Sequence, residues 1–72
     1  MSEFKPKKYK RISNTGFANY ALLEHIEKLD GYRIKCYEEH GIIFYCAVYQ
    51  TALEAISMLN SMDFELIYTI YE

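Results

Sequence analysis

The feature that most constrains the fold is the run Ile42 to Tyr49, which contains only aliphatic, aromatic and cysteine residues. A run of this kind fits a β-strand that is buried on both faces or presents an apolar face to a partner. The chain has 72 residues, and a chain this short buries only about 60% of the surface that its unfolded form exposes. With 51% apolar residues, it carries more apolar surface than one small core can comfortably bury.

Composition narrows the class of protein further. Aromatic residues make up 17% of the chain and the net charge is only −2, which excludes intrinsic disorder. Three glycines and one proline exclude collagen-like and low-complexity chains. We therefore expect a single folded α+β domain over residues 8–72, preceded by an N-terminal arm at residues 1–7.

Positive charge gathers at the N-terminus. Residues 1–11 sum to +4 and residues 12–72 sum to −6. The basic arm residues are Lys5, Lys7, Lys8, Lys10 and Arg11. Such a segment either keeps the chain soluble or reaches an acidic partner or nucleic acid, whereas the acidic remainder argues against a broad phosphate-binding face.

The first half of the chain predicts a weak strand and a helix. Residues 8–13 form a poor strand, because few of them favour β-structure. From Phe17 to Leu29 the apolar residues recur at helical spacing, with charged residues on the other side. Asp30-Gly31 then ends the expected helix, with Gly31 in the left-handed conformation.

A β-hairpin follows, from Tyr32 to Glu38 and from Ile42 to Tyr49, around the loop Glu39-His40-Gly41. If Glu38 pairs with Ile42, then Cys36 faces Phe44. This register puts alternate residues of the second strand in the core, namely Ile42, Phe44, Cys46 and Val48, and turns Ile43, Tyr45, Ala47 and Tyr49 to the other face. A slip of one residue would exchange the two faces.

The last third of the chain predicts a helix and a strand. Thr51 and Glu54 have the spacing of a capping box, in which each side chain bonds the other residue's backbone N–H. The buried stripe of this helix comprises Ala52, Ala55, Ile56, Leu59 and Met62. Asp63 ends the helix, and Phe64 to Tyr71 forms the last strand, with Ile67, Thr69 and Tyr71 on the open face.

The expected order is (β)αββαβ, a ferredoxin-like two-layer sandwich with two helices on one face of the sheet. The charged segment 8–13 is a poor central strand for that fold. The alternative is a three-stranded sheet with two helices and a mobile N-terminal arm.

The stretch Leu59-Asn60-Ser61-Met62-Asp63-Phe64-Glu65-Leu66-Ile67 resembles part of the small bacterial and phage domains of unknown function of the DUF4177 type. In that family a Leu-Asn-x-Leu-like helix end is followed by Gly-Trp-Glu-Leu-Val. Glu65 and Leu66 match, Phe64 replaces the Trp, and Asp63 replaces the Gly. The resemblance implies a ββαβ plan over about residues 32–71, and no known activity.

Catalytic and metal-binding motifs are absent from the sequence. The two histidines, His25 and His40, have no metal-ligand spacing with each other or with the cysteines, and the glycines form no phosphate-binding loop. We expect no enzyme activity, metal or cofactor. The N-terminus lacks the apolar segment of a signal peptide, so we expect a cytoplasmic protein without a membrane span, in which Cys36 and Cys46 are reduced core residues.

The informative surface is the open face of the expected sheet. Its residues are Tyr37, Ile43, Tyr45, Tyr49, Ile67 and Tyr71. Exposed apolar and tyrosine-rich surfaces typically mark contacts. The first hypothesis is a non-enzymatic interaction module that forms a homodimer through its sheet and binds or inhibits another protein, as small phage or mobile-element proteins do.

Three other groups could cover or bind this face instead of a second copy. The arm could fold over it through Phe4 and Tyr9. Single-stranded nucleic acid could stack on Tyr45 and Tyr49 while the basic arm binds phosphates. A small molecule could bind at a dimer seam.

Overall fold

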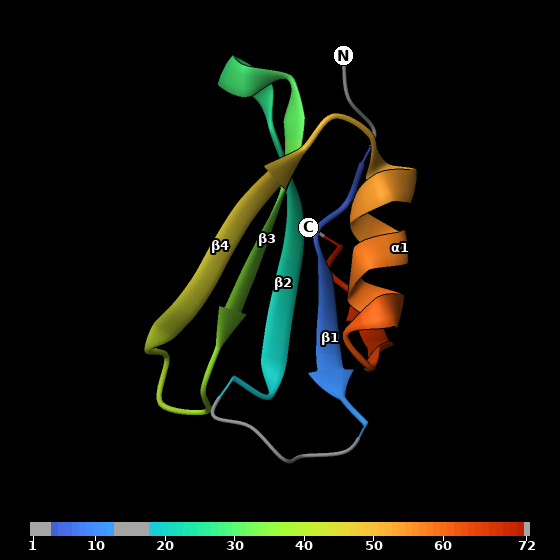
Figure 1. The fold of residues 1–72 in the computed structure, drawn as a ribbon. Coiled ribbons are helices and arrows are strands. Elements are labelled where there is room, and N and C mark those ends of the chain that lie inside the picture. Colours follow the sequence, from blue (N-terminus) through green and yellow to red (C-terminus); the bar gives the residue numbers. More distant parts are fainter. Residues whose placement is uncertain (1–3, 13–17, 72) are drawn as a thin grey trace.

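The computed structural model describes residues 4–12 and 18–71 as one antiparallel sheet with one α-helix against it (Figure 1). The elements are β1 (Lys7–Arg11), β2 (Tyr20–Ile26), the short 3₁₀ helix η1 (Glu27–Leu29), β3 (Gly31–Tyr37), β4 (Ile43–Tyr49), α1 (Ala52–Ser61) and β5 (Phe64–Thr69). The strand order is β4-β3-β2-β1-β5.

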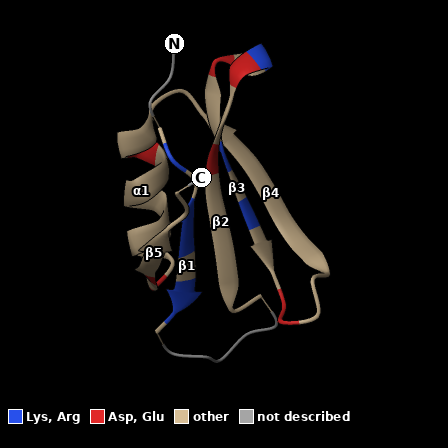
Figure 2. Cartoon of the chain, turned by 180° about the vertical axis from the view of Figure 1, so that it is seen from behind, with Lys and Arg blue, Asp and Glu red and all other residues tan. Residues whose placement is uncertain are grey.

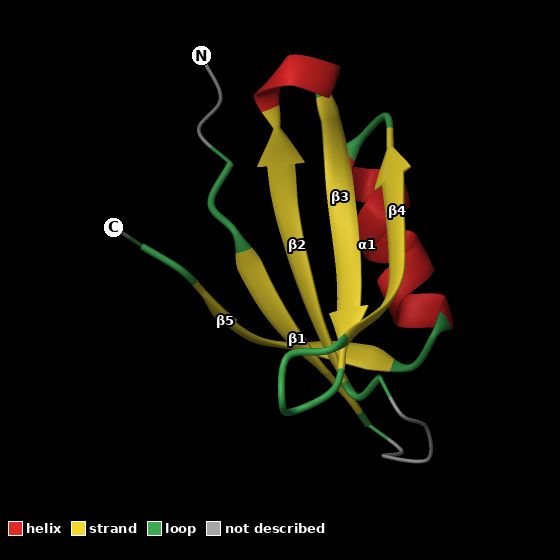
Figure 3. Ribbon diagram, turned by 90° about the vertical axis from the view of Figure 1, so that its left-hand side faces the viewer, coloured by secondary structure: helices red, strands yellow, loops and turns green. Residues whose placement is uncertain are grey.

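This order puts β4 and β5 at the two edges of the sheet, and α1 connects them across one face. Figure 3 looks onto the opposite face, with α1 behind the strands. No described element covers that opposite face, which we call the open face.

The ferredoxin-like fold with two helices is wrong, and so is the three-stranded alternative. The segment expected as the first helix is β2, followed by the single turn η1; its first residue, Phe17, lies outside the described residues. In β2 the buried residues are Ala21 and Leu23, which alternate with half-buried Leu22 at the period of a strand. Pairing with β1 and β3 on both sides outweighs the helical spacing, since tertiary contacts routinely override local propensity.

A first strand does form, at Lys7–Arg11, and overlaps the charged segment 8–13 in which it was expected; residue 13 lies outside the described residues. This strand lies between β2 and β5. Tyr9 faces α1 and is buried, whereas Lys8 and Lys10 lie on the open face, where Lys8 is half-buried and Lys10 is exposed. A sheet covered on one side only can hold lysines in an inner strand.

The predicted hairpin forms, but its register is wrong. The loop closes as expected, because Glu38 N–H donates to the Ile42 carbonyl at 3.0 Å. A β-bulge then shifts the pairing, so that Tyr37 faces Ile43 and Cys36 faces Tyr45. The extra residue turns the rest of β4 over.

The second helix is confirmed together with its cap. Glu54 N–H donates to Thr51 Oγ1 at 3.1 Å, and Thr51 N–H donates to Glu54 Oε1 at 3.2 Å. Of the predicted stripe, Ala55 and Leu59 are fully buried, and the other members are half-buried. The core between α1 and the sheet comprises Tyr9, Ala21, Leu23, Ile34, Cys36, Ala55, Leu59 and Phe64.

Two aspartates adopt the left-handed backbone conformation that favours glycine. Asp30 has φ 48° after η1, although the sequence pointed to the neighbouring Gly31. Asp63 has φ 71° between α1 and β5. Gly31 is needed for space instead, because a Cβ there would lie 2.7 Å from the Val48 side chain.

Candidate interaction surfaces

The first candidate surface is the β4 edge, residues Ile43–Tyr49. Ile43, Phe44, Tyr45 and Val48 are each 43–54% exposed, although β4 is a full strand of seven residues. Among the described strands, β4 pairs with β3 alone. Protein edges of this kind usually carry Lys, Pro or a covering element that prevents pairing with another chain, and β4 carries neither Lys nor Pro.

On the side of α1, the β4 edge borders a hollow of about 540 Å³. The residues lining it are Tyr49, Thr51, Leu53, Glu54, Ser57, Met58 and Ser61. The Tyr45 and Tyr49 hydroxyls lie 3.4 Å apart. The hydrogen bond with Tyr45, together with burial, raises the pKa of Tyr49 to about 12. The Tyr49 phenol is therefore neutral at pH 7.

The second candidate surface is the open face. The Tyr20 and Tyr37 rings stack there with centroids 5.9 Å apart, from opposite positions of β2 and β3. Lys8 Nζ lies 5.0 Å from the Tyr20 centroid and 5.9 Å from the Tyr37 centroid. An ammonium above aromatic rings is attracted by their π-electrons, so the three side chains form one cationic aromatic cluster.

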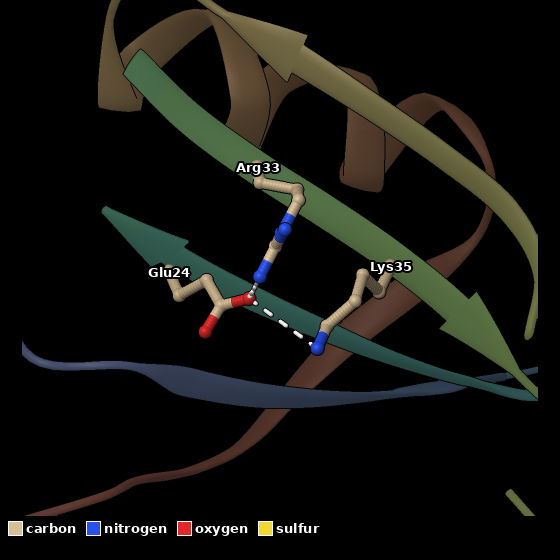
Figure 4. A network of polar contacts seen from close by, with 3 residues as sticks. All are labelled: Glu24, Arg33 and Lys35. Atoms are coloured by element: carbon tan, nitrogen blue, oxygen red, sulfur yellow. Dashed lines mark hydrogen bonds and ion pairs between the residues drawn. The ribbon is translucent and has the colours of Figure 1, made fainter. Parts of the chain in front are cut away.

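A polar network occupies the same face, toward η1 (Figure 4). Glu24 on β2 accepts hydrogen bonds from Arg33 Nε at 3.0 Å and from Arg33 Nη2, and Lys35 Nζ lies 3.4 Å from the same carboxylate oxygen. Burial on its own would raise the pKa of Glu24, but the hydrogen bonds and positive charges of Arg33 and Lys35 outweigh it and the pKa is lowered.

Glu24→Gln is expected to reduce the acid sensitivity of the domain. A carboxylate whose pKa is lowered by folding contributes stability above its unfolded pKa of about 4.5, and this contribution is lost as the pH falls through the lowered value. The urea midpoint of unfolding should therefore decrease less in the variant than in the wild type as the pH is lowered from neutral to below 4.5. Equal slopes in the two proteins would show that the network does not stabilise the fold.

The charges are segregated along the molecule. Figure 2 shows most Lys and Arg along β1 and β3, and most Asp and Glu in η1, in the loop between β3 and β4, and on α1. The exceptions include Lys28 in η1 and Glu24 on β2. The acidic groups therefore flank the basic strands at both ends of the sheet.

The residues predicted as one interaction surface do not all lie together. Tyr37 is on the open face, whereas Tyr45 and Tyr49 lie on the side of α1, opposite Cys36 and Tyr32. Ile43, the first residue of β4, pairs with Tyr37, so these two predicted residues do lie side by side. Ile67 and Tyr71 are on and just beyond β5, at the other edge of the sheet. The bulge in the hairpin is the physical reason for the exchange of faces.

The predicted basic arm is largely a strand. Only Lys5 precedes β1, in which Lys7, Lys8, Lys10 and Arg11 all lie. Phe4 packs against Tyr32 at 5.0 Å, and Tyr32 lies on the α1 side of the sheet. Phe4 therefore lies on that side of the sheet, and not on the open face.

Sequence reasoning missed Tyr20, Arg33 and Lys35 as candidate residues. The alternation in residues 31–37 did put Arg33 and Lys35 on the face away from Cys36. Tyr20 was hidden because its segment was expected to be a helix. The interpretation of both cysteines as core residues holds for Cys36, which is buried, and is wrong for Cys46, which is exposed at the middle of β4.

Among the described residues, no group of three His, Cys, Asp or Glu side chains is placed to hold a metal ion. No helix in the described part of the chain is long and apolar enough to cross a membrane. Comparison of the chain with family models, curated proteins and solved structures finds no match. The resemblance of residues 59–67 to DUF4177-type domains stays a prediction.

Proposed function

We propose that this chain is a non-enzymatic protein-interaction module whose β4 edge pairs with the β4 edge of a second copy. The observation that carries the proposal is the exposure of a long, uncharged edge strand. Unpaired backbone groups on such a strand are a template for further pairing. A second copy of β4 meets the same apolar side chains and no like charge, as a self-complementary two-fold interface requires.

The geometry of this pairing follows from symmetry. Antiparallel pairing of β4 with its own copy puts the two-fold axis perpendicular to the sheet, so both α1 helices lie on the same side. Full overlap of the seven residues centres the axis on Cys46 and places Ile43 opposite Tyr49 of the second copy. The two hollows, each bordered by Leu53 and Met58, then face each other across the central strands.

Pairing of two β4 strands would also bury apolar side chains that the core of a single chain leaves exposed. Large apolar side chains on both sides of β4 are half exposed in the single chain, and apolar burial contributes about 25 cal/mol per Å². Joining the two β4 edges would combine the two five-stranded sheets into one continuous sheet. A cytoplasmic location is part of the proposal, because both cysteines are free thiols, as is usual in reducing compartments.

Ile43→Lys is expected to weaken self-association at least tenfold, because each dimer must then bury two ammonium groups beside the new strand pair. Ile67→Lys is the matched control: it changes the same residue type, at 45% exposure against 54%, on the opposite edge strand. Sedimentation equilibrium or light scattering across a concentration series measures the mass. We expect dimers for the wild type and Ile67→Lys, and monomers for Ile43→Lys.

Oxidation of Cys46 gives a second readout of the same interface. With β4 paired about its centre, the two Cys46 thiols lie on directly opposite residues, where Cα atoms are about 4.5–5.5 Å apart and a disulfide can form. Mild oxidation should yield a covalent dimer that Cys46→Ser abolishes and Cys36→Ser does not. A monomeric wild type at all concentrations, or loss of the dimer in Ile67→Lys alone, would contradict pairing through β4.

A further inference from the structure

We propose that the open face binds single-stranded nucleic acid. The inference concerns the side of the sheet opposite α1, whereas the proposed self-association concerns the β4 edge. It does not depend on that self-association.

The first support is a local reversal of charge. The whole chain has a net charge of −2. On the open face, by contrast, positive groups outnumber carboxylates, the positive side chains being Lys8, Lys10, Arg33 and Lys35 and the carboxylates Glu24 and Glu65. Glu24 is already engaged by Arg33 and Lys35. A phosphate backbone therefore meets a basic surface on a molecule that is otherwise acidic.

The second support is the arrangement of aromatic rings among these cations. Tyr20 and Tyr37 stack on neighbouring strands, with Lys8 above both rings. On β5, Tyr68 lies opposite Lys8 and is about half exposed. Aromatic side chains on a sheet provide surfaces on which unpaired bases stack, while nearby lysines contact phosphates.

The distribution of acidic residues indicates the direction in which a bound nucleic acid would cross the sheet. Glu27 and Asp30, with Lys28 between them, lie in the connection between β2 and β3, and Glu38 and Glu39 lie in the loop between β3 and β4 at the other end. A polyanion running along the β-strands would meet these groups, so the favourable path crosses the strands from β1 over β2 to β3. Neighbouring strands are about 4.8 Å apart, and a path of this length accommodates two or three stacked bases, as in other sheets that bind single strands.

If self-association through β4 also occurs, the two open faces lie on the same side of the joined sheet, because the two-fold axis is perpendicular to it. One nucleic-acid strand could then contact both copies. Binding by a monomeric variant would still be expected, with lower affinity.

The test is fluorescence anisotropy with a labelled 20-nucleotide oligothymidylate. Neutralising about two phosphates by Lys8 and Lys10 predicts a slope of log affinity against log salt near −1.4, so affinity should fall roughly sevenfold between 50 and 200 mM salt. Lys10→Glu should weaken binding at low salt about tenfold. Lys28→Glu changes the net charge equally, from an exposed position in η1, and should change affinity less than twofold.

Stacking is tested separately from charge. Tyr37→Phe keeps the ring and should bind like the wild type, whereas Tyr37→Leu should bind about tenfold more weakly, and the melting curves of both variants show whether the fold is intact. A duplex of the same length and polyglutamate should compete poorly, because neither offers unpaired bases. No salt-dependent binding, equal losses for Lys10→Glu and Lys28→Glu, or equal competition by polyglutamate would overturn the proposal.

A variant that should prevent self-association without changing the open face is Tyr45→Glu, because Tyr45 pairs with Cys36 on the α1 side of the sheet. It separates this proposal from the proposed function. Retained binding of the oligonucleotide by that variant supports the open face as the site. Complete loss of binding in it, with the fold intact, would place the nucleic acid at the β4 edge and overturn the assignment to the open face.

Discussion

Leu59→Ala is expected to lower the free energy of unfolding by about 2–5 kcal/mol, because it removes three carbon atoms from the centre of the core and leaves a cavity. Leu59 is 0% exposed and is one of the largest fully buried side chains, with Leu23 and Ile34. It projects from α1 onto the face of the sheet that this helix covers. Small domains have a total stability near the lower end of about 5–15 kcal/mol, so the variant should be largely unfolded at moderate temperature.

Leu53→Ala is the matched control for this prediction. It makes the same substitution in the same helix, at a side chain that is 74% exposed. Its effect should stay within about 0.5 kcal/mol, as is usual for surface positions. Urea unfolding followed by circular dichroism measures both values, on samples dilute enough to be monomeric. A loss below 1 kcal/mol for Leu59→Ala, or equal losses for the two variants, would contradict the placement of α1 on the sheet.

Arg11→Met is expected to destabilise the domain by about 1–3 kcal/mol, although Arg11 belongs to a segment whose charges suggested a solvated arm. Its guanidinium lies 4.5 Å from the centroid of the Phe64 ring. Nη1 donates to the Met62 carbonyl at 2.8 Å, and Nε and Nη2 donate to the Ala18 carbonyl at 3.3 and 3.1 Å. The side chain thus joins β1 to the end of α1 and to the segment before β2, and hydrogen bonds from a charged donor are the stronger ones.

The neighbouring Lys10 provides the control for Arg11. Lys10→Met removes the same charge from an exposed side chain of the same strand, and its effect on unfolding should stay within about 0.5 kcal/mol. Arg11→Lys should be destabilised nearly as much as Arg11→Met, because a lysine ammonium cannot reproduce the planar fork that reaches two carbonyls. Wild-type stability in both Arg11 variants would show that the hydrogen bonds of Arg11 to the Met62 and Ala18 carbonyls do not stabilise the domain.

The sequence correctly predicted those structural features whose interacting residues are close along the chain. The capping box of Thr51 and Glu54, the extent of α1 and the loop between β3 and β4 are all confirmed, since each depends on residues within a few positions of one another. The segment 17–29 failed because its apolar residues fit two periods at once. Ala18, Leu22 and Ile26 match a helix, whereas Ala21 and Leu23 match a strand, and only β1 and β3 on either side decide between them.

Which β4 side chains lie on which face of the sheet depends on a one-residue shift in the pairing of β3 with β4. The sequence indicated that apolar and tyrosine side chains exceed what the core can hold, and that β4 carries many of them. It could not show the bulge near Phe44, which turns Tyr45 and Tyr49 toward α1 and leaves Cys46 and Val48 on the open face. A bulge changes few local contacts but reverses every later side chain, so no local pattern reveals it.

The sequence by itself determined that the chain forms one small α+β domain, that its second half is strand, strand, helix and strand, and that apolar side chains remain in excess. These properties follow from composition and from interactions within a few residues. Only the tertiary structure decided that residues 20–26 are a strand, that β4 and β5 are opposite edges, and that the lysines of β1 share a face with Tyr20 and Tyr37. The reason is that pairing energy in a sheet comes from residues far apart in the chain, and their register is fixed only when all five strands are together.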